Sequence, residues 1–303
     1  MNRRIPALLC AMLILTLVIC GCTAPTPKNN VSLPASGTGP AGIPVGKGQY
    51  VFNDSLGNAD RPITVYTYRP AAWNTSGPVL IVMPGAGREG QSPRETWMPY
   101  AEKYSALLVV PEFSQQYYPG DLWYIGGNTY DATNWQPKTN WTYMAIEHLF
   151  DDIRAKSGAT TGTYLLEGHS AGAQFVHRMV TLLPGARYSR AVAANAGVYL
   201  LPDYTVPYGF GLKDSPLYEN ELPAVFAKKL IIMSGEADTT RDASLASFAE
   251  AEAQGSTRFE RAKTYFATAQ AEAARRNLPL NWEYHDEAGM AGPSAALLFA
   301  PGT

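Results

Sequence analysis

The segment Gly168-His169-Ser170-Ala171-Gly172 fits the pattern G-x-S-x-G. In this pattern the serine is a nucleophile when it lies on a tight turn between a strand and a helix. The apolar run before residue 168 predicts the strand, and the amphipathic run after residue 172 predicts the helix. The sequence therefore predicts acyl transfer through Ser170. An ordinary glycine-rich turn with a surface serine is the alternative.

Stabilisation of an oxyanion requires backbone N–H donors beside the nucleophile. One donor is expected from Ala171, because the first N–H groups of a helix have no partner within it. The other is expected from a loop after an earlier strand, and a glycine-rich turn at residues 84–88 follows the apolar run at residues 79–83. We therefore expect the N–H groups of Ala86 and Ala171 to form the oxyanion hole. A glycine turn without a ligand is the alternative for the first of them.

The acid that orients the base is expected after a later strand. The apolar run at residues 230–233 leads to Asp238, with Glu236 and Asp242 as nearby competitors. The base follows the acid in the order Ser…Asp…His. Of the four histidines, only His285 lies beyond Asp238.

The other three histidines are less suitable as the base. His169 is adjacent to the nucleophile, where successive side chains diverge. His177 lies seven residues along the predicted helix, about 10 Å away at 1.5 Å per residue. His148 belongs to the preceding predicted helix. Elimination therefore favours His285.

Apolar runs without alternation are typical of parallel strands covered on both faces. With a β-rich segment at residues 63–68, such runs lie at residues 79–83, 107–110, 164–166, 191–194 and 230–233. Helical patterns at residues 141–156, 171–183 and 259–276 are interspersed with them. This order predicts an α/β fold with a mainly parallel central sheet and helices on both faces.

Residues 113–140 and 198–224 match no regular element, and long loops of this kind tend to cover a ligand site at the carboxyl ends of the strands. Their aromatic side chains are candidates for a cleft that binds an apolar or aromatic acyl group, with loop packing as the alternative. They are Tyr117, Tyr118, Trp123, Tyr124, Trp135, Tyr199, Tyr204 and Tyr208.

The first 22 residues have the layout of a bacterial export signal. Arg3 and Arg4 precede an apolar run that ends in Ile19-Cys20-Gly21-Cys22, which resembles a lipobox. We therefore expect residues 1–22 to be a lipoprotein signal peptide and Cys22 to carry a lipid anchor to the membrane. An uncleaved membrane helix is the alternative, although the run is short for a span.

The expected location is the bacterial cell envelope or the secreted fraction, and Thr23 in place of an aspartate favours an outer-membrane anchor. Residues 23–48 are rich in Pro, Gly, Ser and Thr and predict a flexible tether. The α/β domain is then expected at residues 49–303. All three cysteines precede it.

The net charge of −2 gives no reason to expect a nucleic acid partner. The sequence has no His/Asp/Glu cluster with metal-ligand spacing. Neither a metal nor a cofactor is therefore expected.

Roughly residues 60–300 resemble the α/β-hydrolase superfamily, and within it bacterial secreted and lipoprotein esterases similar to poly(3-hydroxybutyrate) depolymerases and feruloyl esterases. The most specific stretches are GHSAGAQFVHR (168–178), AANAG (193–197), GEADTT (235–240) and HDEAGM (285–290). The resemblance implies an α/β-hydrolase fold with loop insertions over the site. It also implies a catalytic triad of Ser170, Asp238 and His285.

Two departures from the family pattern bear on the site. Pro84-Gly85 stands where relatives usually have His-Gly, and His285 follows Trp282-Glu283-Tyr284 without the usual P-G-x-G-H turn. An alternative alignment equates residues 288–292 with that turn and puts Gly292 at the position of the base. We prefer the alignment that retains His285, because His285, Asp286 and Met290 match the stretch after the turn.

The leading hypothesis is a serine hydrolase that cleaves small-molecule or polymeric carboxylic esters through an acyl-enzyme. A catalytically silent lipoprotein of the same fold, which binds a ligand or partner at the envelope, is the alternative. A peptidase of the same fold is a third possibility.

Overall fold

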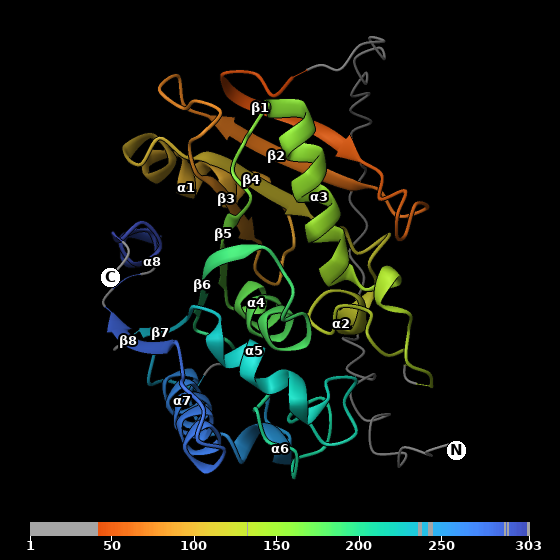
Figure 1. Cartoon of the computed structure of the whole chain (residues 1–303), viewed down its shortest axis with the longest axis vertical. Helices are drawn as coiled ribbons and strands as arrows, with labels where there is room; N and C mark the ends of the chain where they lie inside the picture. Colours follow the sequence, from red (N-terminus) through yellow and green to blue (C-terminus); the bar gives the residue numbers. More distant parts are fainter. Residues whose placement is uncertain are drawn as a thin grey trace, which may run out of the picture.

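The computed structural model describes residues 42–131, 133–235, 238–241, 245–287, 289 and 291–301. Within these residues, eight strands form one sheet in the order β1-β2-β4-β3-β5-β6-β7-β8 (Figure 1). The strands are β1 (Gly46–Phe52), β2 (Ile63–Arg69), β3 (Val79–Met83), β4 (Leu107–Glu112), β5 (Tyr164–His169), β6 (Tyr188–Ala194), β7 (Leu230–Gly235) and β8 (Trp282–Glu287).

The strands from β4 to β8 in the sheet order are parallel, whereas β2 pairs antiparallel with both β1 and β4. The mainly parallel sheet predicted from the sequence is therefore confirmed. Because parallel strands end at the same edge, the loops after β3, β5, β6 and β7 meet there. This edge carries most of the candidate catalytic residues.

Helices cover both faces of the sheet, as the continuous apolar strands require. The longer ones are α1 (Gln91–Lys103), α3 (Thr142–Ser157), α4 (Ala171–Leu182), α7 (Arg258–Arg275) and α8 (Ala291–Leu298). The shorter ones are α2 (Gly120–Trp123), α5 (Leu222–Ala227), α6 (Ala249–Glu252) and the 3₁₀ turns η2 (Lys138–Asn140) and η3 (Glu219–Glu221).

Two apolar layers lie on the two faces. Helices α1 and α8 pack on one face, against Val82, Val192 and Met233. Helices α3, α4, α5 and α7 contribute to the layer on the other face, which contains Ile81 and Leu166 (Figure 1). Strand β3 is buried at all five positions because both layers cover it.

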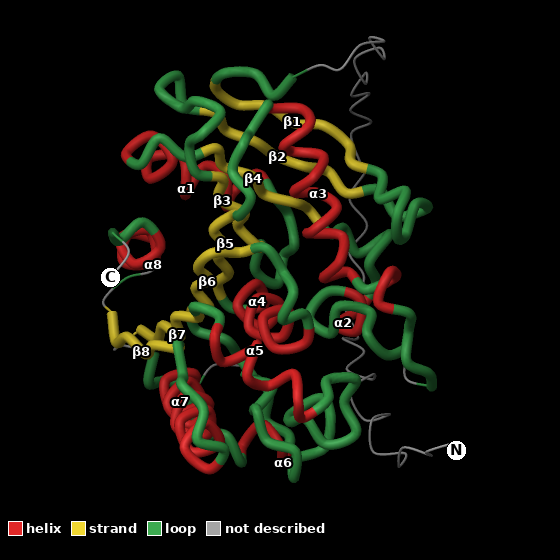
Figure 2. The backbone as a smooth tube through the Cα atoms, viewed as in Figure 1, coloured by secondary structure: helices red, strands yellow, loops and turns green. Residues whose placement is uncertain are grey.

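Several elements differ from those expected. Strand β1 begins at Gly46, three residues before the expected start of the domain, and Ile43 is already buried. The sequence patterns also did not indicate α1 or α8. Figure 2 shows that the chain between α2 and α3 and between β6 and α5 is mostly loop, in line with the two irregular stretches predicted from the sequence.

The expected signal peptide, the lipidated Cys22 and most of the tether lie outside the described residues. Among the helices that the structure describes, none has the length and apolar character needed to cross a membrane.

Candidate active site

Ser170 lies on the turn between β5 and α4, at the carboxyl edge of the sheet. Its backbone has φ 56° and ψ −115°, in the positive-φ region that non-glycine residues rarely adopt. Such a conformation costs about 1–3 kcal/mol and persists only where the surroundings enforce it. The Ser170 N–H donates to the carbonyl of Ala194 at the end of β6, over 2.9 Å.

Two glycines make this turn possible. A Cβ on Gly168 would lie 2.3 Å from the carbonyl carbon of Gly172. A Cβ on Gly172 would lie 2.3 Å from the carbonyl oxygen of Met83. The first turn of α4 therefore packs directly on the ends of β5 and β3. The predicted strand–turn–helix around Ser170 is present, and its glycines are required by close backbone approach.

The loop after β3 lies beside this turn. The N–H of Arg88 donates to the carbonyl of Gly85 at 2.9 Å and closes a tight turn around the exposed Ala86. A Cβ on Gly85 would lie 3.9 Å from the carbonyl oxygen of His169. Within the described chain, the N–H groups of Ala86 and Ala171 donate no hydrogen bond. Both N–H groups therefore remain candidates for the oxyanion hole, and Ala171 directly follows Ser170.

The 113–130 loop holds this turn in place. The hydroxyl of Tyr124 donates to the carbonyl of Pro84. The buried guanidinium of Arg88 donates to the carbonyl of Tyr118 at 2.6 Å and contacts Asp121 at 3.3 Å. These anchors fix the backbone on both sides of Ala86, and no pattern in the sequence indicated these contacts.

Asp238 lies just beyond β7, two strands from β5 at the same edge. Its N–H donates to the carbonyl of Gly235 at 2.9 Å. Its carboxylate accepts a 2.9 Å hydrogen bond from Nδ2 of Asn195, and Nη1 of Arg258 lies 3.6 Å from the other oxygen. The competing candidates Glu236 and Asp242 lie outside the described residues.

His285 lies within β8, at the far edge of the sheet. It pairs with Met233, which pairs with Ala194, which pairs with His169. Three strand spacings of about 4.8 Å separate these rows, so the backbone of His285 is about 14 Å from that of His169. Its Nε2 lies 3.3 Å from Oε2 of Glu283. Ser170 and Asp238 thus lie at the carboxyl ends of the parallel strands. Among the described residues, no hydrogen bond joins His285 to Ser170 or to Asp238.

Comparisons with known proteins place this geometry in a family. No family model matches the sequence, and no curated protein sequence gives a significant match. Solved structures do. Poly(aspartic acid) hydrolase-1 from Sphingomonas sp. KT-1 is 36% identical with a TM-score of 0.81, over 85% of this chain and 100% of that one. LpqC, a poly(3-hydroxybutyrate) depolymerase from Bordetella parapertussis, is 34% identical with a TM-score of 0.80, over 84% and 89% of the two chains.

The chain belongs to the α/β-hydrolase superfamily. An S-formylglutathione hydrolase from Agrobacterium tumefaciens, 15% identical with a TM-score of 0.50 over 88% of this chain and 95% of that one, shares the fold. The relatives are hydrolases and esterases, which supports hydrolysis as the general activity.

The other histidines of this α/β hydrolase have different surroundings. Desolvation and the nearby Arg258 lower the pKa of His169, and Asp238 opposes them. His177 is fully buried; its Nδ1 donates to the carbonyl of Ala173 at 2.8 Å, and its Nε2 accepts from the N–H of Leu200 at 2.9 Å. Nδ1 of His148 lies 2.7 Å from Asp54. His177 and His148 are therefore engaged in contacts that hold the fold.

Half of the aromatic side chains proposed for an acyl-binding cleft are instead buried in the core of this hydrolase. Tyr118, Tyr124, Tyr199 and Tyr208 are at most 8% exposed. The remaining ones are partly buried and pack against the same apolar layer. Packing within the loops therefore explains the four buried tyrosines.

Gly292, which the alternative alignment puts at the position of the base, lies in α8. Gly292 lies in the first turn of α8, where a Cβ would meet the hydroxyl of Tyr100 on α1 at 3.2 Å. This position is on the face covered by α1 and α8.

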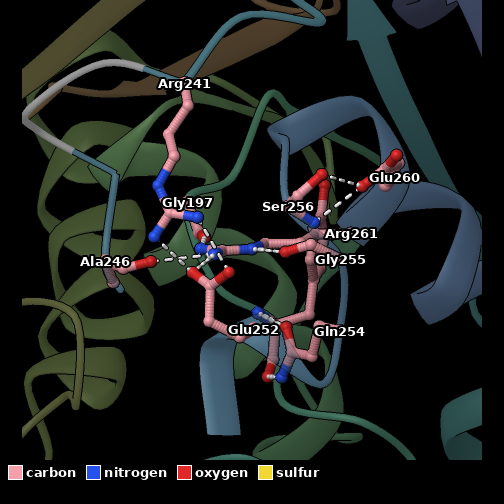
Figure 3. Close-up of polar contacts among 10 residues, drawn as sticks. Gly197, Arg241, Ala246, Glu252, Gln254, Gly255, Ser256, Glu260 and Arg261 are labelled. Atoms are coloured by element: carbon pink, nitrogen blue, oxygen red, sulfur yellow. Dashed lines mark hydrogen bonds and ion pairs between the residues drawn. The ribbon is translucent and has the colours of Figure 1, made fainter. Parts of the chain in front are cut away.

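Hydrogen bonds from buried side chains hold the segment at residues 245–261 against the loop after β6 (Figure 3). Arg261 on α7 donates to the carbonyls of Gly197 at 2.6 Å and of Ala246 and Gly255 at 2.8 Å. The amide of Gln254 bonds both backbone groups of Tyr199 at 2.8 Å. The segment from residue 245 to α7 is therefore fixed against the chain that follows Asn195.

Proposed function

We propose that this chain is a serine hydrolase of carboxylic esters with Ser170 as the nucleophile. The observation that carries the proposal is the strained backbone of Ser170, which two glycines accommodate at the carboxyl edge of the sheet. Strain of this kind concentrates at functional sites, and this turn presents the serine hydroxyl above the sheet.

The proposed reaction begins when a base removes the hydroxyl proton of Ser170 and Oγ attacks the ester carbonyl. The N–H groups of Ala86 and Ala171 bind the resulting oxyanion, and in known enzymes one such donor contributes about 2.7–4 kcal/mol. Collapse of the intermediate breaks the ester C–O bond, the base returns its proton to the leaving alcohol, and an acyl-enzyme remains. A water molecule, activated by the same base, then releases the acid.

His285 is proposed as the base and Asp238 as the acid that orients it. His285 pairs with Glu283 within β8, so this role requires the end of β8 to separate from β7. β8 is an edge strand, and its last three residues are all polar. Local opening at such an edge has a low free energy compared with unfolding of the core.

The similarity to a poly(3-hydroxybutyrate) depolymerase supports a polymeric or small-molecule ester as substrate. Poly(aspartic acid) is linked by amides, so the similarity to its hydrolase supports the peptidase alternative. With the lipid anchor expected at Cys22, the enzyme would act at the cell envelope.

A catalytically silent protein of this fold is the second candidate. The placement of His285 in β8, about three strands from the nucleophile, specifically favours it. In that case the strained turn of Ser170 is retained without a base.

Covalent labelling by a fluorophosphonate probe, located by mass spectrometry, separates the two functions. The full-length protein in detergent is compared with Ser170→Ala, His285→Ala and His169→Ala. Labelling at Ser170 that only the first two substitutions abolish supports the proposed triad. Labelling that survives in His285→Ala assigns the base elsewhere, and a folded wild type that takes no label is catalytically silent.

A further inference from the structure

We infer that Asn195 is a positioning residue that sets the orientation of the Asp238 carboxylate, an inference that rests on the proposed function. Asn195 is the first residue after β6 and is 6% exposed. It lies between the turn of Ser170 and the loop of Asp238, and it is not part of the triad.

The Asn195 side chain forms two directed hydrogen bonds to the end of β7 and the loop beyond it. Its Oδ1 accepts from the N–H of Gly235 at 2.8 Å, and its Nδ2 donates to Oδ2 of Asp238 at 2.9 Å. One amide therefore holds both the last residue of β7 and the carboxylate three residues later. Because the two bonds use opposite ends of the planar amide, they fix the direction in which the carboxylate points.

The backbone of Asn195 links the same residue to the nucleophile. Its N–H donates to the carbonyl of Met233 at 2.9 Å, and the preceding carbonyl, of Ala194, accepts from the N–H of Ser170. Its φ of 51° lies in the left-handed region, which asparagine tolerates better than most residues. The positions of Ser170 and Asp238 are thus coupled through adjacent residues of one strained turn.

A second side-chain contact of Asp238, with a cation, is longer. Nη1 of Arg258, on α7, is 3.6 Å from Oδ1, and among the described residues the charge of Asp238 also acts on His169 at the end of β5 and on the buried Tyr199. The short bond from Asn195 is therefore the contact that defines the direction of the carboxylate, while Arg258 contributes charge.

The substitution Asn195→Asp tests this role because it retains the shape and replaces the Nδ2 donor with an oxygen. At low pH the two carboxyl groups share a proton, and the shared proton restores a hydrogen bond to Asp238. At high pH both groups are ionised and repel each other, which turns the Asp238 carboxylate away. We expect labelling of Ser170 by the probe to be about tenfold or more slower than in the wild type at pH 8, and this deficit to shrink at pH 5.5.

Two further variants of the full-length protein complete the test. Asn195→Gly suits the left-handed backbone and removes both side-chain bonds, so its labelling should be slower by the same factor at both pH values. Gln254→Glu is the matched control, because it changes an equally buried amide that joins the same loops through Tyr199 and does not contact Asp238. Its labelling rate relative to the wild type should not fall as the pH rises.

Each labelling rate is divided by the wild-type rate at the same pH, which removes any effect of the titration of His169, because all the proteins contain this residue. Circular dichroism confirms that each variant is folded at each pH. Wild-type labelling rates in Asn195→Asp at pH 8 would overturn the inference and leave the proposed function standing. A deficit in Asn195→Asp that matches Gln254→Glu at both pH values also overturns it, because Asn195 would then only hold the loop. A wild type that is not labelled at Ser170 overturns the proposed function, and the inference with it.

Discussion

The substitution Gly172→Ala separates the stability of this fold from the geometry of the proposed oxyanion hole. The added Cβ would lie 2.3 Å from the carbonyl oxygen of Met83 and 2.9 Å from that of Pro84. Ordinary contact needs about 3.4 Å, so the first turn of α4 must move by about 1 Å. The Ala171 N–H, one residue earlier, moves with it.

Two opposing free energies decide the effect on stability. Overpacking of this size costs about 1–3 kcal/mol. Alanine is preferred over glycine within a helix by about 1 kcal/mol, which offsets part of that cost. The net loss is therefore about 0–2 kcal/mol, and the protein remains folded. A displacement of about 1 Å at a catalytic group, by contrast, can reduce the rate by about a hundredfold.

We therefore expect the melting temperature of Gly172→Ala to lie within several degrees of that of the wild type. The fluorophosphonate probe should label its Ser170 about ten- to a hundredfold more slowly. Gly185→Ala is the control, because a Cβ at Gly185, just after α4, meets no atom within 4 Å. Differential scanning calorimetry and labelling rates provide the two measurements. A folded Gly172→Ala that labels at the wild-type rate would refute the close packing of α4 on β3 as a determinant of the site.

Three other substitutions give distinct signatures. Burial lowers the pKa of His177 well below its ordinary value, so below about pH 6.5 only the unfolded chain gains the proton. The free energy of unfolding of the wild type, measured with urea, should therefore fall below this pH. That of His177→Gln should fall less. Burial raises the pKa of Glu167 to about 8, so the wild type should lose about 1.4 kcal/mol per pH unit relative to Glu167→Gln as the pH rises from about 4.5 to 8, measured by urea unfolding. Glu283→Ala removes the partner of His285 and should speed labelling of Ser170 about two- to tenfold, measured with the same probe; a slower rate would contradict the proposed opening of β8.

The sheet was predictable because its strands are buried on both faces. Ile81 and Val82 lie on opposite faces of β3, and both are apolar because helices cover both faces. Strand β1 was not predicted because its first six residues alternate between partly and fully exposed and two of its first three residues are glycines. Helix α1 was not predicted because it has few apolar residues and because one of its buried residues, Arg94, is charged.

The turn of Ser170 was predictable from local spacing, whereas the contacts that support it were not. Gly168 and Gly172 lie within the motif itself, so their role follows from sequence position. Asn195, Tyr124 and Arg88 contact the site from three separate loops. No spacing within the sequence brings these loops together; only the common edge of the parallel strands does.

Chain order favours His285 as the proposed base, but the structure places it about three strands from Ser170. The free energy needed to open the end of β8 determines whether the two can meet. For His285 to approach Ser170, the pairs Met233–His285, Ser234–Asp286 and Gly235–Glu287 must separate. At about 0.5–1.5 kcal/mol for each net hydrogen bond, opening costs about 1.5–4.5 kcal/mol, which leaves His285 free in about one molecule in ten to one in a thousand. Lys229 holds the pKa of Glu283 below its ordinary value, so this carboxylate stays ionised and retains His285 in the strand. If His285 is the base, the fluorophosphonate probe should label Ser170 slowly in the wild type and faster in Glu283→Ala. If the protein is catalytically silent, Glu283→Ala should not change the labelling.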